Sequence, residues 1–190
     1  MSGLSAVVER RKYFLAAAIV FVVDQASKIA ADRWLRPRGS VEIIPGLFDL
    51  SYSRNRGGLF GYFSTLEDPW RLVLLTVLPI VAIVVIAVFL VRTEESDRVT
   101  RTGLAAILGG ASGNLLDRIL RGEVVDFLDV YVSWTPVKTW LVDLFGTSHW
   151  PTFNVADSSI VIGAGLLLVD LVRPAHRRAV AEPTAEREAS

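Results

Sequence analysis

The sequence predicts an all-α membrane bundle of four transmembrane helices, with a small extracytoplasmic β-sheet and a loop with a short amphipathic helix on the same side. Three observations support this fold class. Long apolar blocks alternate with charged segments, and the mean hydropathy is +0.43. The blocks approach the roughly 20 residues that a helix needs to cross a hydrocarbon core. Their polar residues gather near one set of helix ends. The length of 190 residues allows one compact unit.

The composition excludes several function classes. The chain has 20 basic and 20 acidic residues, so its net charge of zero disfavours a nucleic-acid partner. It has no cysteine, which rules out disulfides and thiol nucleophiles. The two histidines, His149 and His176, stand too far apart for metal-ligand spacing. We therefore expect no metal and no cofactor.

The four predicted spans cover residues 13–31, 72–91, 102–120 and 153–172. The second is the clearest because it contains no charge. The third is the least apolar, since three glycines lower its hydropathy, although Gly109 and Gly113 have the small-xxx-small spacing of closely packed membrane helices. We expect one domain over residues 1–172 and a disordered cytoplasmic tail over 173–190.

The first span has an alternative interpretation as a cleavable signal peptide, because a basic cluster at residues 10–12 precedes the apolar run from Tyr13 to Val23. Asp24, Gln25 and Lys28 follow that run, and no A-x-A site stands directly behind it. An uncleaved first span is the better interpretation.

Basic residues predict the orientation of the bundle. The N-terminal tail, the 92–101 segment and the tail after 172 hold ten Lys and Arg, whereas the longer loops 32–69 and 121–152 hold seven. Both termini are therefore expected in the cytoplasm and both loops outside it, by a modest margin.

Nearly every polar residue within the spans should lie at the extracytoplasmic end of an up-down-up-down bundle. Ionisable residues at membrane depth are costly and usually pair or serve a site. This end is therefore predicted to hold a functional site, which collects Asp24 and Lys28 from span one, Asn114, Asp117 and Arg118 from span three, and Asn154 and Asp157 from span four.

Each of these groups also has a purely structural explanation. Asp24 and Lys28 are four residues apart and can form an ion pair along one helix. Asp117 can pair with Arg118. At the start of span four, Asn154 can cap the helix while Asp157 interacts with its positive end.

The two extracytoplasmic loops add further candidates. Asp126, in the apolar segment GEVVDFLDV, is either a surface carboxylate or one held in a low dielectric, where a second carboxylate raises its pKa. Two carboxylates sharing a proton form the working unit of aspartic proteases. Residues 40–63 are predicted to form short strands broken at Pro45-Gly46 and Gly57-Gly58. An amphipathic run from Val137 to Phe145 predicts a short helix on the membrane surface.

Five motifs in order, VVDQASK, NRGGLF from Asn55 to Phe60, GGASGNLLDR, GEVVDFLDV and FNVADSSIVIG, resemble the lipoprotein signal peptidases (signal peptidase II) over about residues 13–172. The resemblance implies a bacterial inner-membrane aspartic endopeptidase that cuts a prolipoprotein before its lipid-modified cysteine. It implies catalytic roles for Asp126 and Asp157, a choice that the residues alone leave open between Asp126 and Asp117. It also implies site-supporting roles for Asp24, Lys28, Asn55, Gly110, Asn114, Asp117, Arg118 and Asn154.

The expected partners are the prolipoprotein and membrane lipid, and we expect a monomer. Two features depart from the family's pattern: the segment between Asp126 and Asp157 is long, and Arg56 stands beside Asn55 where a small or neutral residue is more usual.

Rival functions are also open to test. A serine protease would use Ser27 with Lys28, but adjacent residues on a helix point to different faces. A proton-coupled transporter would use buried aspartates near mid-membrane within repeats, whereas here the polar groups gather at one end. A purely structural membrane protein would not need so many intramembrane charges.

Overall fold

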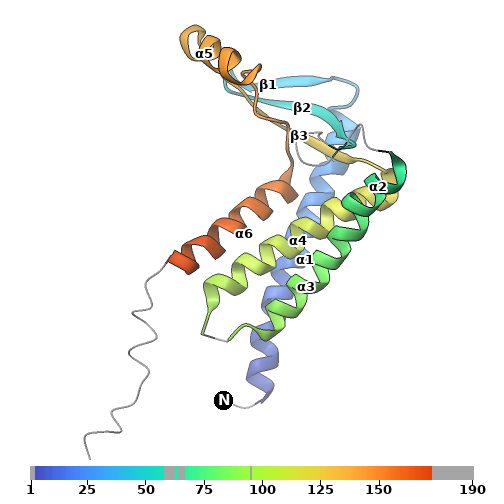
Figure 1. Ribbon diagram of the computed structural model, residues 1–190, viewed down its shortest axis with the longest axis vertical. Helices are drawn as coiled ribbons and strands as arrows, with labels where there is room; N and C mark the ends of the chain where they lie inside the picture. Colours follow the sequence, from blue (N-terminus) through green and yellow to red (C-terminus); the bar gives the residue numbers. More distant parts are fainter. Residues whose placement is uncertain (1–2, 58–62, 64–66, 95, 173–190) are drawn as a thin grey trace, which may run out of the picture.

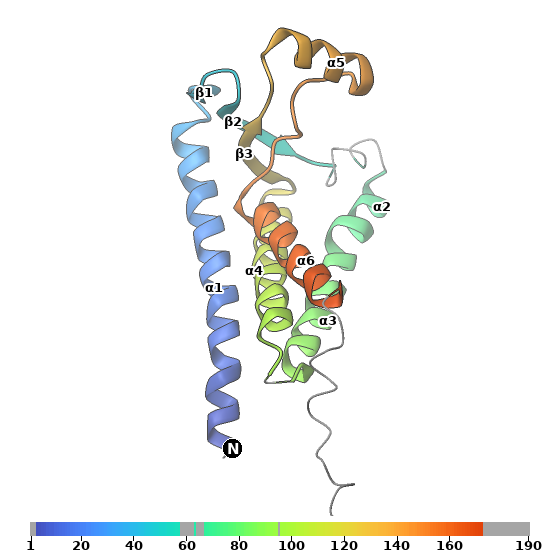
Figure 2. The ribbon, with the colours of Figure 1, turned by 90° about the vertical axis from the view of Figure 1, so that its left-hand side faces the viewer.

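The computed structural model describes residues 3–57, 63, 67–94 and 96–172. It is a helical bundle with a small sheet at one end (Figure 1). The N-terminus lies at the opposite end, as the view turned by 90° also shows (Figure 2). The helices are α1 (Gly3–Trp34), α2 (Asp68–Leu72), the π-helical η2 (Val73–Val77), α3 (Leu78–Arg92), α4 (Arg98–Arg121), α5 (Thr135–Phe145) and α6 (Val155–Val172), and the strands are β1 (Ser40–Ile44), β2 (Phe48–Asn55) and β3 (Val124–Val130).

Three helical stretches within the described residues are long and apolar enough to cross a membrane: Arg10–Trp34, Pro69–Arg92 and Val155–Val172. They expose large apolar side chains, including Leu78 at 57% and Val161 at 70%. Exposed apolar surface on this scale marks a surface that faces lipid or a partner. The protein is therefore a mostly helical membrane protein.

The second apolar stretch is one continuous helix made of α2, η2 and α3. Its π-helical turn ends just before Pro79. Proline has no N–H to donate to the preceding turn, and wider turns of this kind accommodate such a break in the regular ladder. The helix continues to Arg92, as the uncharged block from residue 72 predicted.

Helix α4 is central and contacts α1, α3 and α6. Its glycines allow this close packing. A Cβ on Gly109 would stand 2.5 Å from the Ala17 carbonyl oxygen of α1, and one on Gly103 would stand 2.8 Å from the Gly163 carbonyl oxygen of α6. The glycines that lower the hydropathy of this segment are therefore the residues that let it occupy the centre.

The sheet is antiparallel in the order β1-β2-β3. Strands β1 and β2 are joined at Gly46, whose φ of 75° suits glycine. The strands expected within residues 40–63 are confirmed as β1 and β2. The sequence did not predict that β3 is a strand: the segment around Asp126 was expected to lie on the bundle or lipid surface. It does pack against α1 and α4, and it also pairs with β2.

Two apolar clusters hold the molecule together. One, in the half of the bundle away from the sheet, contains Tyr13, Ala17, Leu90, Leu104, Ala105 and Leu108. The other joins the end of α1 to the sheet through Ala31, Leu35, Val125 and Phe127. The second cluster fixes β3, and with it Asp126, above the ends of the helices.

The boundaries refine the predicted spans. Helix α1 is longer than residues 13–31, α6 begins two residues later than expected, and α4 covers the third predicted span without being one of the three apolar stretches. The amphipathic run is confirmed as helix α5. The described residues do not include 58–62, which hold the last three residues of the NRGGLF motif. They also do not include the tail 173–190.

Candidate active site

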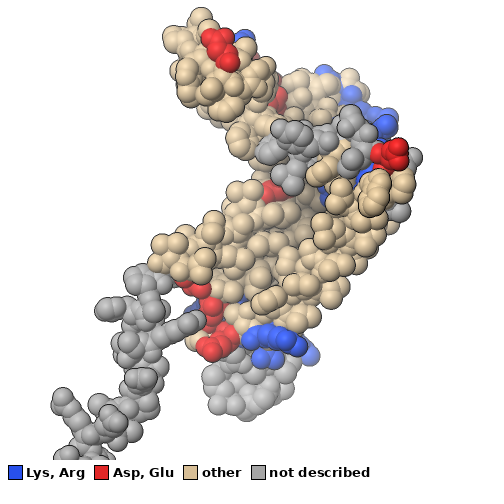
Figure 3. All heavy atoms as spheres, in the orientation of Figure 1, with Lys and Arg blue, Asp and Glu red and all other residues tan. Residues whose placement is uncertain are grey.

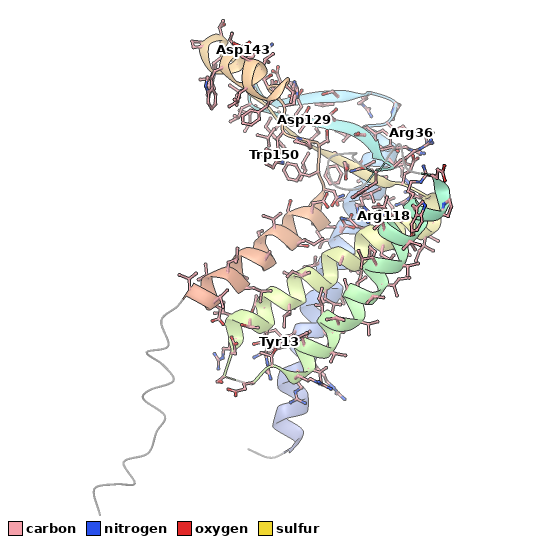
Figure 4. The ribbon with its side chains drawn as sticks, viewed as in Figure 1. Tyr13, Arg36, Arg118, Asp129, Asp143 and Trp150 are labelled. Atoms are coloured by element: carbon pink, nitrogen blue, oxygen red, sulfur yellow. The ribbon has the colours of Figure 1, made fainter. Side chains whose placement is uncertain are left out.

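The polar residues predicted to converge do meet at the sheet end of the bundle. In Figure 4, Arg118 marks this place at the end of α4, beneath the sheet, while Tyr13 lies far away in the other half of the bundle. Asp24, Lys28, Asp117 and Asn154 are completely buried there, and Asp126 is 3% exposed.

Lys28 is the centre of the first part of this network. Its Nζ lies 2.9 Å from the Asp24 carboxylate, so the predicted ion pair along α1 is confirmed. The same ammonium lies 3.1 Å from Asp117 Oδ2 and donates to Asn114 Oδ1 at 2.8 Å, both on α4. Asp24 in turn accepts from the Ala156 N–H of α6 at 2.9 Å. Lys28 thus joins α1 to α4, and its partner Asp24 joins α1 to α6.

Asn154 links this network to the two candidate carboxylates. Its side chain accepts from the Asp157 N–H at 2.9 Å, and the Asp157 carboxylate accepts from the Asn154 N–H at 3.2 Å, so the two residues form a reciprocal cap at the start of α6. The predicted capping role of Asn154 is therefore confirmed. Its Nδ2 also donates to Asp126 Oδ1 at 2.6 Å.

Asn114 holds Asp157 from the other side. Its Nδ2 donates to Asp157 Oδ1 at 2.7 Å while its carbonyl oxygen accepts from Lys28 and from Asn154. Both hydrogen-bonding atoms of this amide are used, which fixes its orientation. Asp157 is therefore oriented by two asparagines from different helices, and it stays half-buried at the edge of the network.

Asp126 lies in β3, outside the helices. Burial and, to a smaller extent, the nearby Asp157 carboxylate together raise the pKa of Asp126 to about 7, against the hydrogen bonds from Asn55 and Asn154. A carboxyl with this pKa can hold or release a proton near neutral pH. The sheet and α6 thus bring together two carboxylates that stand 31 positions apart in the sequence.

A further carboxylate, Glu123, fixes the strand that carries Asn55. Glu123 is 4% exposed and forms ion pairs with Arg54 and, at 2.9 Å, with Arg56. Burial would raise the pKa of Glu123, but hydrogen bonds from Arg56 and Arg54 outweigh it and lower the pKa. Glu123 was not among the predicted site residues, since only the folded sheet brings it beside Arg54 and Arg56.

The predicted Asp117–Arg118 pair is not formed. Asp117 pairs with Lys28 and, along α4, with Arg121, because neighbours on a helix point to different faces whereas residues four apart share one. Arg118 instead interacts electrostatically with Asp157, Asp126 and Asp117. Arg118 therefore lies within electrostatic range of both candidate carboxylates.

Gly110 and Gly113 make room for these contacts. A Cβ on Gly110 would stand 2.5 Å from the Ala156 carbonyl oxygen and would also meet Ser159 of α6. A Cβ on Gly113 would meet the Asp24 carboxylate, with Asp24 Cγ at 3.1 Å. The two glycines therefore set the distances from α4 to α6 and to α1 at the level of the site.

The other candidate chemistries find less support. Ser27 donates to the Asp24 backbone carbonyl at 2.7 Å, away from the Lys28 ammonium, so these two do not form a nucleophile–base pair. Within the described residues, no group of three or more His, Asp or Glu side chains is arranged to hold a metal ion.

Comparisons with known proteins agree with this architecture. The profile of the Signal peptidase (SPase) II family matches residues 16–173. Proteins named lipoprotein signal peptidase are similar along most of the chain: that of Solibacter usitatus is 39% identical over 90% of this chain and 96% of its own length, and that of Geobacter sulfurreducens is 42% identical over 83% and 89%. A solved bacterial membrane enzyme superposes with a TM-score of 0.68 at 26% identity, over 86% of this chain and 94% of that one.

The fold and the site define a helical membrane protein with two aspartates gathered at one end of its bundle. The profile match and the relatives show which one: the chain belongs to the signal peptidase II family. It is accordingly a protease of a bacterial inner membrane.

Proposed function

We propose that Asp126 and Asp157 are the catalytic pair of an aspartic endopeptidase that cuts a prolipoprotein immediately before its diacylglyceryl-modified cysteine. As a signal peptidase II, the chain removes signal peptides from prolipoproteins. The observation that carries the residue assignment is Asn154, which hydrogen-bonds to Asp126 through its side chain and to Asp157 through its backbone. One residue thus contacts both carboxylates.

The proposed chemistry uses one shared proton. Asp126 is the more deeply buried of the two and its pKa is raised to about 7, so it carries the proton. Asp157 takes a proton from water, whose oxygen attacks the scissile carbonyl carbon, while Asp126 donates its proton to the carbonyl oxygen. When the resulting tetrahedral diol breaks the C–N bond, the Asp157 proton passes to the amine, and Asp126 recovers its proton from the diol.

The remaining residues hold the pair in place. Lys28 neutralises Asp24 and Asp117 and fixes Asn114, which orients Asp157. Arg118 supplies positive charge near both carboxylates. Asn55 hydrogen-bonds to Asp126. Gly110 sets the approach of α4 to α6.

We further propose that α4 is a fourth transmembrane helix within one domain over residues 1–172. It packs against the three apolar stretches and runs alongside them (Figures 1 and 2). Its hydropathy is low because much of its surface faces other helices rather than lipid. With both termini cytoplasmic, as the basic residues predict, the sheet and the site lie near the extracytoplasmic surface. The enzyme acts as a monomer among membrane lipids.

The test is cleavage of a diacylglyceryl-modified prolipoprotein by purified protein in detergent, with Asp126→Asn and Asp157→Asn beside the wild type. Asparagine keeps the side-chain shape but cannot hold or transfer the shared proton. Each variant should lose about 10²–10⁴-fold in turnover while remaining folded and able to bind substrate. A folded variant that cuts at a rate near that of the wild type would disprove the pair, and Asp117→Asn and Asp24→Asn would then be compared.

A chelator provides the second arm of this test. The proposed chemistry uses water and two carboxyl groups, so activity should persist in EDTA. Inhibition that a divalent ion reverses would contradict the assignment.

A further inference from the structure

The half of the bundle away from the sheet ends in a group of basic side chains that the proposed chemistry does not use. Figure 3 shows Lys and Arg side chains at this end, next to acidic ones on the side of α6. Two of the basic residues, Arg10 of α1 and Arg101 of α4, are turned into the bundle and have buried side-chain nitrogens. Tyr13, labelled in Figure 4, marks this place.

Helical spacing places these two arginines on facing sides of α1 and α4. Arg10 stands three residues before Tyr13, and Arg101 stands three residues before Leu104; Tyr13 and Leu104 belong to the same apolar cluster. Residues three apart share a helix face and are separated by about 4.5 Å along the axis. The Arg101 guanidinium carbon lies 5.6 Å from the centroid of the Tyr13 ring. Both arginines therefore lie one turn beyond this cluster, where α1 and α4 face each other.

Each arginine holds a buried nitrogen that has no hydrogen-bond acceptor among the described residues. Arg101 is completely buried. Its Nε and Nη2 donate to the Thr93 carbonyl oxygen at 3.3 and 2.7 Å, but its Nη1 has no partner. The Nε of Arg10 is likewise buried without a partner. A guanidinium group stays charged in proteins, so burying one without an anion is costly.

The carboxylates described at this end have other partners. Asp97 accepts from the Thr100 N–H at 3.0 Å, as the cap of α4, and Asp170 accepts from the Thr100 hydroxyl at 2.9 Å. Glu94 is exposed and accepts from the Ser96 hydroxyl at 3.4 Å. None of these three carboxylates forms an ion pair with either arginine in the described structure. The two arginines thus offer their free donors to an anion from outside the chain.

The position of Arg10 indicates which anion this is. The first membrane-crossing stretch begins at Arg10, which places this residue where α1 enters the bilayer, at the level of the phospholipid headgroups. Arginine binds phosphate through paired N–H donors, and basic sites between membrane helices bind anionic headgroups. Arg10 is half-buried, so an anion that approaches from the surface meets Arg10 before Arg101.

We propose that Arg10 and Arg101 form a binding site for a phosphate group, supplied by an anionic phospholipid of the leaflet at this end. The phosphate accepts hydrogen bonds from Arg101 Nη1 and from Arg10, and it links α1 to α4 at the end of the bundle opposite the sheet. This proposal rests on the membrane location of the family and not on the proposed catalytic pair.

The test measures the binding of phosphatidylglycerol to the purified full-length protein by native mass spectrometry in a mild detergent. Wild type is compared with Arg10→Gln, Arg101→Lys and Arg11→Gln. Arg11→Gln is the matched control, because it removes the same charge from the next residue of α1, which is exposed. Arg101→Lys keeps the charge but removes the fork of N–H donors. Thermal unfolding and circular dichroism confirm that each variant is folded.

We expect one tightly bound phosphatidylglycerol on the wild type. Its affinity should fall about tenfold or more in Arg10→Gln and in Arg101→Lys, as for the loss of a hydrogen bond to a charged group, and by less than about twofold in Arg11→Gln. Equal losses in Arg10→Gln and Arg11→Gln would overturn the site, because they would show a diffuse attraction between basic residues and anionic lipid.

Two further ligands identify the source of the phosphate. Diacylglycerol has the same acyl chains but no phosphate, so binding as tight as that of phosphatidylglycerol would overturn the role of the phosphate. Inorganic phosphate tests a free anion. If it raises the unfolding temperature of the lipid-free wild type but not of Arg10→Gln, and displaces phosphatidylglycerol, the phosphate site stands and its lipid source is overturned. None of these measurements depends on turnover, so a failure here is distinct from a failure of the Asp126–Asp157 assignment.

Discussion

The two ends of the bundle are built from the same helices but hold opposite kinds of interior. At the sheet end, Lys28 is buried among Asp24, Asp117 and Asn114 from two helices. At the other end, Arg101 is equally buried, but it donates to the Thr93 backbone carbonyl and lies over the Tyr13 ring. No carboxylate in the described part of the chain pairs with it.

The difference shows what each buried cation does. Arg101 caps the end of α3, where the last carbonyls of a helix lack partners, and so closes the turn between α3 and α4. Lys28 instead neutralises Asp24 and Asp117 and hydrogen-bonds to Asn114, which orients Asp157. One end of the bundle is organised around stability, and the other is organised around keeping charged groups in place.

The largest effect should come from removing each cation. Lys28→Met leaves Asp24 and Asp117 buried without their common partner, which typically costs about 3–5 kcal/mol of stability. Arg101→Met loses hydrogen bonds but leaves no charge unpaired, so its cost should be about 1–3 kcal/mol. Thermal unfolding in detergent measures both. The double variant Lys28→Met with Asp24→Asn should recover part of the loss, and equal costs for the two single variants would remove the contrast between the ends.

The next effect concerns protons at the sheet end. Because the pKa of Asp126 is raised to about 7, the folded protein keeps the shared proton below this pH and loses it above. Turnover should therefore fall about tenfold per pH unit at alkaline pH, as for the loss of one essential proton. A pH–rate profile between pH 5 and 9, with the folded fraction checked at each point, measures this. A rate that stays flat to pH 9 would contradict the shared proton.

The free energy of unfolding should also fall as the pH rises. The pKa of Asp126 is higher in the folded protein than the ordinary value of 3.8, so the folded state holds a proton that the unfolded chain releases. Its contribution is complete below about pH 4 and is lost as the pH rises through about 7. Asp126→Asn should flatten this part of the stability profile.

Glycines test whether packing and function separate along α4. Gly113→Ala displaces the Asp24 carboxylate, whereas Gly103→Ala pushes against the Gly163 backbone in the other half of the bundle. Each overpacked site should cost about 1–3 kcal/mol of stability. Only Gly113→Ala should also lower the turnover of the folded fraction. Gly165→Ala is the matched control, since nothing lies within 4 Å of its added Cβ, and it should be neutral or slightly stabilising.

The smallest stability effect is expected beside the sheet. Arg56 is 72% exposed, so Arg56→Ala should change stability by no more than about 1 kcal/mol. It should nevertheless lower turnover a few-fold, because Arg56 and Glu123 steady the segment next to Asn55. Glu123→Gln should act in the same direction on turnover. Arg92→Ala, at the end of α3 away from the sheet (Figure 1), should leave turnover unchanged. Steady-state kinetics with thermal unfolding separates the two effects.

Several elements followed from local patterns in the sequence. The uncharged block from residue 72 predicted a long apolar helix, the Pro45-Gly46 break predicted the turn between β1 and β2, and the amphipathic run predicted α5. The Asp24–Lys28 pair and the cap by Asn154 also followed, because they depend on spacing within one helix. The meeting of the polar residues at one end of the bundle also followed, because successive spans cross the membrane in opposite directions.

Other contacts required the folded chain. The sequence GEVVDFLDV does not distinguish a strand paired with β2 from a segment lying on the membrane, because a short run of apolar residues is compatible with both. Asp117 found Lys28 and Arg121 rather than Arg118, and Glu123 found Arg54 and Arg56 across the sheet. These partners lie on different elements, and the sequence contains no rule for their distances.

The sequence by itself determined that this chain crosses a membrane, that its charged groups gather at one end of the helices, and, through its ordered motifs, which family it belongs to. Those properties depend on composition and on spacing along the chain. Tertiary structure decided that β3 brings Asp126 to Asn154, and that Lys28 and Asp24 together join three helices. Such contacts depend on how closely the helices approach at Gly110 and Gly113, and that distance exists only once the bundle and the sheet have packed.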